Sequence, residues 1–310
     1  MDASEAQFSS SQRLLQITIF DALAFLAVFL VGAVLATALF SRKVNRRRPW
    51  YNMLVSWLVY SASYLLLVGF QGDKGPPFWF CFLQAVFVYG APPLAAFGTA
   101  CYIVDLYLSV SSLHVVPRKP TSSATLVLLF IPWVAFISVI IEISILVTRD
   151  PSSVKRSPGL VYCHLDTTIQ VTSNVALGAI AGVILVPLEI WIAILLRKSR
   201  TKCQEFEDVN PQSKQLSLLI RSAVFTAMVL IGVALNITAC WLNNQRIVIW
   251  SIFLPTAPIL LAISFGTQRD IMTVWAFWKK SPTLSNPPVD NTRRVQSQPT
   301  DLTSPSESPC

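Results

Sequence analysis

Charged residues are scarce in this chain. Asp, Glu, Lys and Arg make up 13% of its 310 residues, whereas hydrophobic residues make up 53%. Soluble globular domains carry about 25% charged residues, which form their hydrated surface. A chain with so little charge cannot cover a soluble core of this size with a polar surface. The composition therefore excludes an ordinary soluble protein and indicates an integral membrane protein.

Groups for chemistry inside a membrane are also lacking. The two histidines, His114 and His164, fall in predicted loops on opposite sides of the membrane. Asp105 has no second aspartate at a matching depth, so the pair that an aspartyl intramembrane protease needs is missing. No lysine lies inside the last hydrophobic segment, which argues against a retinal Schiff base. We therefore expect no enzyme activity, no metal site and no cofactor.

Long uncharged segments account for most of the chain. About twenty apolar residues are enough to cross a bilayer as a helix. Seven windows meet this length, at residues 22–41, 49–71, 75–104, 121–141, 167–188, 222–245 and 247–268. The sequence therefore predicts an all-α fold, an integral membrane bundle of seven transmembrane helices that occupies residues 17–266.

Positive residues predict how this bundle is oriented. Eighteen of the 24 lysines and arginines follow the first, third, fifth and seventh windows, and six lie elsewhere. Lysine and arginine are enriched in cytoplasmic loops. We therefore expect residues 1–16 outside the cell, the C-terminus in the cytosol, and a multi-pass protein of the plasma membrane. Since these clusters explain the net charge of +8, no nucleic-acid partner is expected.

The chain after the last window divides into two parts. Residues 267–280 mix apolar and aromatic side chains with charged ones, and this pattern predicts a short amphipathic cytosolic helix on the lipid bilayer. Residues 281–310 are rich in Ser, Pro, Thr and Asn, and we expect a disordered cytosolic tail.

Residues 79–110, in the third window and just after it, carry informative residues at both ends. Cys81 lies at the predicted outer end, and Cys163 lies in the predicted outer loop 149–166. Both face the oxidising side, so a disulfide between them is predicted, the alternative being two free cysteines. Asp105 follows Cys81 by 24 residues. At 1.5 Å per residue this separation is about 36 Å, which places Asp105 at the cytosolic rim.

These features resemble those of a G-protein-coupled receptor. The resemblance covers the topology, the two cysteines, the Asp105-Leu106-Tyr107 sequence, and two single residues, Trp133 and Pro187. Leu106 stands where the rhodopsin-like pattern has arginine.

The last window adds a resemblance to fungal receptors. Pro258 keeps the proline of the Asn-Pro-x-x-Tyr motif without its asparagine or tyrosine. Residues 264–271 are similar to the same region of fungal pheromone receptors. The core of the chain thus resembles divergent fungal receptor-like proteins.

The resemblance implies a receptor that senses an extracellular or lipid-phase ligand and signals to a heterotrimeric G-protein. Five residues are candidates for the switch or the G-protein-facing surface: Asp105, Tyr107, Pro187, Glu189 and Pro258. The alternative function is a multi-pass transporter or channel without G-protein coupling. That class predicts paired charges along a pathway and repeat symmetry, and neither is visible in the sequence.

Residues within the third and later windows suggest where a ligand would bind. Pro92 and Pro93 are expected to kink or locally unwind the third helix, because proline lacks the N–H of a helical hydrogen bond. Exposed backbone at that depth would border a pocket. The alternative is a kink that serves only the packing of the helices. The candidate pocket residues are Tyr89, Pro92, Pro93, Phe97, Glu142 and Trp241. For Glu142 and Glu189, rim exposure or a local hydrogen bond is the competing interpretation.

Overall fold

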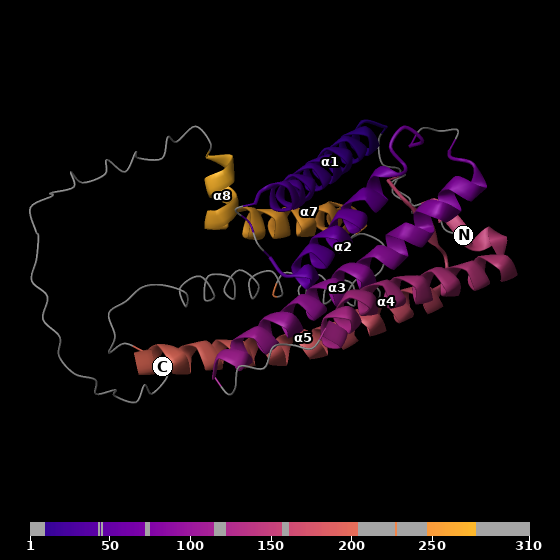
Figure 1. Ribbon diagram of the computed structural model, residues 1–310. Coiled ribbons are helices and arrows are strands. Elements are labelled where there is room, and N and C mark those ends of the chain that lie inside the picture. The colour runs from indigo at the N-terminus through magenta and orange to yellow at the C-terminus, as the bar shows by residue number, and fades with distance from the viewer. Residues whose placement is uncertain are drawn as a thin grey trace, which may run out of the picture.

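Long helices dominate the structure, a computed structural model that describes residues 10–42, 44, 46–71, 75–114, 122–156, 161–203, 227 and 247–276. The predicted sixth helix at 222–245 (apart from residue 227), the tail 281–310 and residues 277–280 of the amphipathic segment lie outside this part. The helices are α1 (Ser10–Phe40), α2 (Arg48–Leu65), α3 (Phe78–His114), α4 (Ser122–Arg149), α5 (Thr168–Cys203), α7 (Ile247–Gly266) and α8 (Arg269–Trp275). The short α8 turns across the end of α7 (Figure 1).

Among the residues that the structure describes, four helices are long and apolar enough to cross a membrane. Their apolar parts are Leu14–Phe40, Phe78–Ser109, Ser123–Arg149 and Thr168–Leu195, and α7 adds a shorter apolar stretch, Leu254–Gly266. Large apolar side chains point away from the bundle, among them Phe29, Phe130 and Val183, which are 71%, 63% and 73% exposed. Such a surface suits lipid and not water. The structure thus confirms a mostly helical protein, and several of its helices suit a membrane by length and composition. The predicted count of seven spans goes beyond these four.

The helix α3 lies at the centre of the bundle. It packs against α2, α4 and α5, while α7 packs beside α1 and α2. Two glycines let neighbouring helices come close to α3. A Cβ at Gly90 would stand 2.7 Å from the Phe136 ring on α4, and one at Gly98 would stand 2.9 Å from Ser56 Oγ on α2. Small residues at helix contacts are a common means of packing within membranes.

Two details of the helices differ from the sequence-based expectation. The helix α3 runs without interruption through Pro92 and Pro93, so the expected local unwinding is wrong. Tertiary packing on three sides holds the helix together where isolated propensity would weaken it. The first helix begins at Ser10, whereas the bundle was predicted to begin at residue 17. Gln16 is buried within this first stretch.

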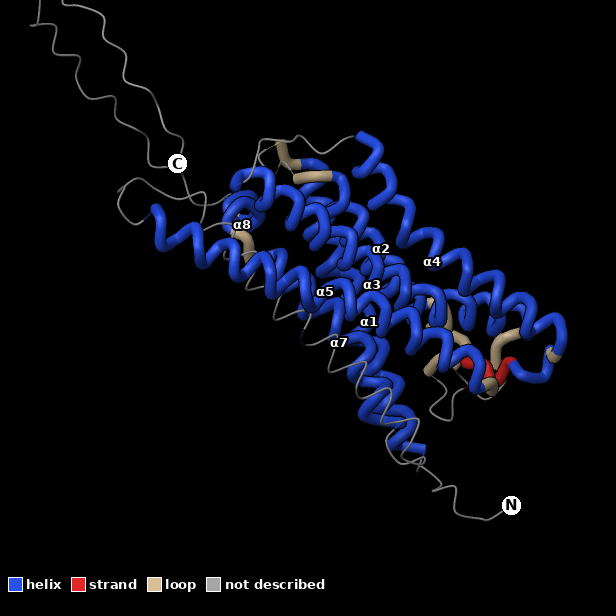
Figure 2. The backbone as a smooth tube through the Cα atoms, turned by 90° about the horizontal axis from the view of Figure 1, so that it is seen from below, coloured by secondary structure: helices blue, strands red, loops and turns tan. Residues whose placement is uncertain are grey.

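The connection from α4 to α5 is ordered as a hairpin, where the sequence predicted only a loop. A short 3-10 turn, Pro151–Ser153, leads into β1 (Val154–Arg156), which pairs antiparallel with β2 (Cys163–Leu165). Figure 2 shows these two strands at one end of the bundle and α8 at the opposite end. These are called the hairpin end and the α8 end below.

Candidate functional site

A disulfide joins the hairpin to α3. Cys81 and Cys163 are bonded, with their Cα atoms 5.5 Å apart, which confirms the predicted pair. Cys163 is fully buried, and its backbone N–H donates to Gln84 Oε1 on α3 at 2.9 Å. Further along β2, the N–H of Leu165 donates to the Tyr89 hydroxyl at 3.3 Å. The strand β2 is therefore fixed along the first turns of α3 by one covalent bond and two hydrogen bonds.

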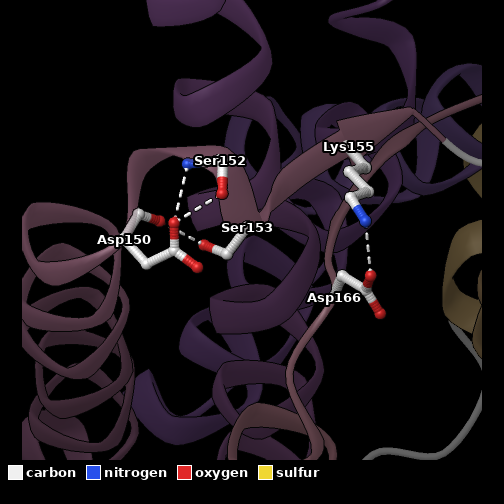
Figure 3. A network of polar contacts seen from close by, with 5 residues as sticks. All are labelled: Asp150, Ser152, Ser153, Lys155 and Asp166. Atoms are coloured by element: carbon white, nitrogen blue, oxygen red, sulfur yellow. Dashed lines mark hydrogen bonds and ion pairs between the residues drawn. The ribbon is translucent and has the colours of Figure 1, made fainter.

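Polar contacts also hold the base of the hairpin (Figure 3). Asp150 Oδ1 accepts hydrogen bonds from the Ser152 backbone N–H and hydroxyl at 3.0 and 2.6 Å, which shapes the turn after α4. Lys155 Nζ lies 2.6 Å from Asp166 Oδ2. The hydrogen bond and charge of Lys155 lower the pKa of Asp166, and those of Asp166 raise the pKa of Lys155. Both side chains are exposed, so this pair orients the hairpin and adds little stability.

Four polar residues that contact the hairpin or follow it closely in the chain carry buried atoms with no hydrogen-bond partner among the described residues. Gln170, in the first turn of α5, is 0% exposed, and neither atom of its amide has a hydrogen-bond partner in the described part of the chain. Three further atoms are buried and have no partner among the residues that the structure describes: Asn174 Oδ1, one turn further along α5, Thr167 Oγ1 and Gln84 Nε2. An unsatisfied buried polar group costs about 1–3 kcal/mol. These four residues, Gln84, Thr167, Gln170 and Asn174, are called the polar cluster. The sequence-based candidates did not include these residues, although Gln170 and Asn174 are four positions apart and so share one face of α5.

The intramembrane acids near the hairpin end have neutral partners. Glu142 Oε2 on α4 accepts a hydrogen bond from Ser173 Oγ on α5 at 2.8 Å. Asp21 Oδ1 on α1 accepts from Gln71 Nε2 at 2.8 Å. The contact of Glu142 is the local hydrogen bond that competes with a ligand-binding role for this residue. The first contact joins α4 to α5, and the second joins α1 to the segment that follows α2.

The predicted aromatic pocket stays a prediction, because only two of its three aromatic residues are described. Tyr89 lies under the hairpin, whereas Phe97 is eight residues further along α3, roughly 12 Å deeper by helical rise. Pro92 and Pro93 lie between them inside the continuous helix. Trp241 lies outside the described residues. Within the described part of the chain, the polar cluster is a second candidate for ligand contact beside the aromatic set.

At the α8 end, Asp105 forms an ion pair that the sequence analysis missed. Its side chain is 6% exposed, and its Oδ1 lies 3.0 Å from Arg47 Nη1. Arg47 Nη1 also donates to the hydroxyl of Ser109, which donates in turn to the Asp105 carbonyl oxygen at 2.7 Å. The cation for this buried carboxylate thus comes from the turn between α1 and α2 and not from position 106. In the sequence, Arg47 is only one of the positive residues that predict which side of the bundle faces the cytosol.

The preceding residue, Arg46, holds the junction of α7 and α8. Arg46 Nη2 lies 2.7 Å from Asp270 Oδ2 and 2.8 Å from Gln268 Oε1. Its guanidinium carbon lies 5.9 Å from the centre of the Trp50 ring. We call Arg46 and Arg47 with their partners Asp105, Gln268 and Asp270 the arginine clamp.

The helix α8 docks on the bundle as well as facing outward. Ile271 is fully buried, while Met272 is 45% exposed. The Trp275 indole Nε1 donates to Thr37 Oγ1 on α1 at 2.8 Å. This alternation agrees with an amphipathic helix, and its buried face contacts α1.

The other switch candidates occupy different environments. Tyr107 is half-buried near the α8 end, and Glu189 is buried on α5. Pro187 is exposed and Pro258 is buried, and neither interrupts its helix. Pro258 leaves the carbonyl of Leu254 without its helical donor, and the Tyr60 hydroxyl on α2 donates to this oxygen at 3.2 Å. Pro258 therefore marks a contact between α2 and α7.

Neither the known protein-family models nor the curated protein sequences match this chain. Its function is therefore inferred from the residues and contacts described above.

Proposed function

We propose that this protein is a receptor of the seven-helix, G-protein-coupled kind. In this proposal it lies in the plasma membrane with the hairpin end outside and the α8 end in the cytosol. It senses a ligand from outside or from the lipid phase, and it signals to a heterotrimeric G-protein. The uncharged segment 222–245, outside the described residues, would complete the seven spans together with α2 and α7.

The observation that carries the proposal is the position of α3. One uninterrupted helix connects the disulfide-anchored hairpin at Cys81 with the buried, ion-paired Asp105. A rigid helix with specific restraints at both ends can transmit a displacement from one end to the other, because a shift at the first end changes the energy of contacts at the second. This arrangement supports a signalling function more directly than a transport function, which needs a polar pathway through the bundle.

The polar cluster supports a ligand at the hairpin end. A ligand that hydrogen-bonds to Gln170 and Asn174 would recover the free energy that their burial costs in its absence. The cluster lies beside β2, so binding there would act on the strand that the disulfide ties to α3. We therefore expect a ligand with hydrogen-bonding groups.

The test measures signalling in cells that display the protein at their surface. An epitope tag at the N-terminus, stained on intact cells, checks the proposed orientation. Nucleotide exchange is then measured across a panel of G-proteins and ligands for the unaltered protein and for Cys163→Ser, which releases the hairpin from α3. Exchange that depends on a ligand and is lost in the variant supports the proposal. Surface-displayed protein without exchange under any condition would refute it, and ion or solute flux would be measured next.

A further inference from the structure

Two adjacent arginines on one short turn hold two different parts of the α8 end. Arg47 reaches α3 through Asp105 and Ser109. Arg46 reaches the α7–α8 junction through Asp270 and Gln268. The turn that carries them connects α1 to α2 and contains only residues 41–47. Because the arginines are neighbours in the chain, a movement that releases one of them disturbs the contacts of the other.

The two residues of the Arg47–Asp105 ion pair differ in how much they depend on each other. The Asp105 side chain is 6% exposed, whereas that of Arg47 is 42% exposed. Arg47 would be hydrated if the pair opened, but Asp105 would be left as a buried charge without a cation. The pair therefore opens favourably only if the cytosolic part of α3 shifts so that Asp105 reaches water or a new cation.

The second ion pair, Arg46–Asp270, restrains the α7–α8 junction from moving away from the base of α3. Arg46 and Asp270 are partly exposed, at 20% and 37%, and Gln268 is buried beside them. Gln268 and Asp270 flank the start of α8, at the bend that follows α7. The turn therefore crosses from the base of α3 to this bend and limits how far the two can separate.

We infer that the arginine clamp is a regulatory lock, in which the α1–α2 turn holds α3 and the α7–α8 junction together until activation. In the proposed receptor the locked state is the uncoupled one, so the regulatory meaning rests on the proposed function. In this chain the residue after Asp105 is Leu106, which carries no charge. The cation that restrains Asp105 therefore comes from Arg47 of the clamp. The opening itself is a structural property that can be measured without any G-protein.

The first experiment measures the distance across the clamp. Spin labels are placed on two exposed positions, Leu108 of α3 and Met272 of α8, as Leu108→Cys and Met272→Cys. The background replaces Cys203, Cys240 and Cys310 with serine. Double electron–electron resonance is then recorded for Arg47→Ala and for Asp270→Asn. Both variants are expected to show the same new population at longer distance, because each releases one half of a shared restraint.

Two further variants control this measurement. Arg48→Ala removes the neighbouring arginine, which is exposed and forms no hydrogen bond or ion pair with other described residues, and it should leave the distance distribution unchanged. The double variant Arg47→Asp with Asp105→Arg reverses the pair and should restore the original distribution. A purely structural role would instead lower the thermal stability of Arg47→Ala and Asp270→Asn with no new distance population, and that result would overturn the inference.

The second experiment measures basal nucleotide exchange. Opening the clamp should raise the basal rate about fivefold or more, the lower end of coupling in switching proteins. An unchanged or reduced rate in Arg47→Ala, in a protein whose unaltered form responds to ligand, would also overturn the inference. If the distances change but no form of the protein stimulates exchange, the clamp is supported as a conformational restraint and the proposed function is the part that fails.

Discussion

The hydroxyl of Tyr60 on α2 donates a hydrogen bond to the carbonyl oxygen of Leu254 on α7, with 3.2 Å between the oxygen atoms. In an α-helix this carbonyl would accept from the N–H four residues later. The residue four positions after Leu254 is Pro258, which has no N–H. Tyr60 therefore replaces a missing helical bond and joins α2 to α7.

Replacing Tyr60 with phenylalanine should destabilise the protein in a way that depends on Pro258. Tyr60→Phe leaves the Leu254 carbonyl unsatisfied, and we expect the free energy of unfolding to fall by about 0.6–2 kcal/mol. In a Pro258→Ala background the alanine N–H can satisfy this carbonyl, so the cost of Tyr60→Phe should shrink. Thermal unfolding of the four proteins in detergent gives the coupling energy. An equal cost in both backgrounds would contradict this role of Tyr60.

Adding a methyl group at Gly90 should disturb the contact between α3 and α4. The new Cβ would stand 2.7 Å from Cε2 of Phe136. Overpacking of this kind costs about 1–3 kcal/mol, partly offset by the better helix propensity of alanine. Gly90→Ala should therefore lower the unfolding temperature, and adding Phe136→Leu should recover part of the loss.

A matched control for this prediction lies on α1. A Cβ at Gly32 would meet its nearest atom, Leu58 Cδ1, at 4.0 Å. Gly32→Ala should be neutral or stabilise the protein by up to about 1 kcal/mol. A loss of stability at Gly32 as large as that at Gly90 would show that close packing on Phe136 is not the cause.

Removing the disulfide should cost more stability than any other single contact discussed here. Cys81 and Cys163 are separated by 82 residues, and loss of a native disulfide typically costs about 2–5 kcal/mol. The double variant Cys81→Ser, Cys163→Ser should unfold at a lower temperature. Reductant should lower the unfolding temperature of the unaltered protein and leave that of the variant unchanged. The prediction fails if reductant affects both proteins equally.

Mild acid should loosen the hairpin through His164. Burial lowers the pKa of this histidine from its ordinary value of about 6.5, an effect that the charge of Asp166 opposes. Because the folded pKa is the lower one, the stabilising contribution of neutral His164 is full above about pH 6.5 and declines as the pH falls below it. Hydrogen exchange at the hairpin amides, corrected for intrinsic rates, should therefore speed up between about pH 6.5 and 5.

A variant separates this effect from the neighbouring ion pair. His164→Gln should remove the change between about pH 6.5 and 5, since glutamine does not titrate. The pKa of Asp166 is lowered by Lys155, so the contribution of that pair persists above the ordinary aspartate pKa and is lost only at more acidic pH. Equal protection at pH 7.5 and 5.5 in the unaltered protein would rule out His164 as the sensitive group.

The length of an apolar segment, and the side of the membrane expected for its ends, can be predicted from the sequence of that segment and its flanking residues. The uncharged windows predicted α1, α3, α4 and α5 as apolar helices because about twenty apolar residues in a row must find lipid or a core. The pairing of Cys81 with Cys163 followed from placing two cysteines on the same side of the predicted bundle. The sequence also identified Asp105 as a notable residue, because a charge at the end of a long apolar segment is unusual.

Only the tertiary structure decided which side chains meet. Asp105 pairs with Arg47, 58 positions earlier in the chain, and in the sequence Arg47 is one of several similar arginines in the same turn. Gln170 became a candidate only because its amide is fully buried and has no partner within the described ranges of the chain. The hairpin strands are three residues each, too short for an alternating pattern to reveal. Lipid exposure depends on the composition of one segment, whereas an ion pair or an unsatisfied amide depends on what a different helix brings beside it.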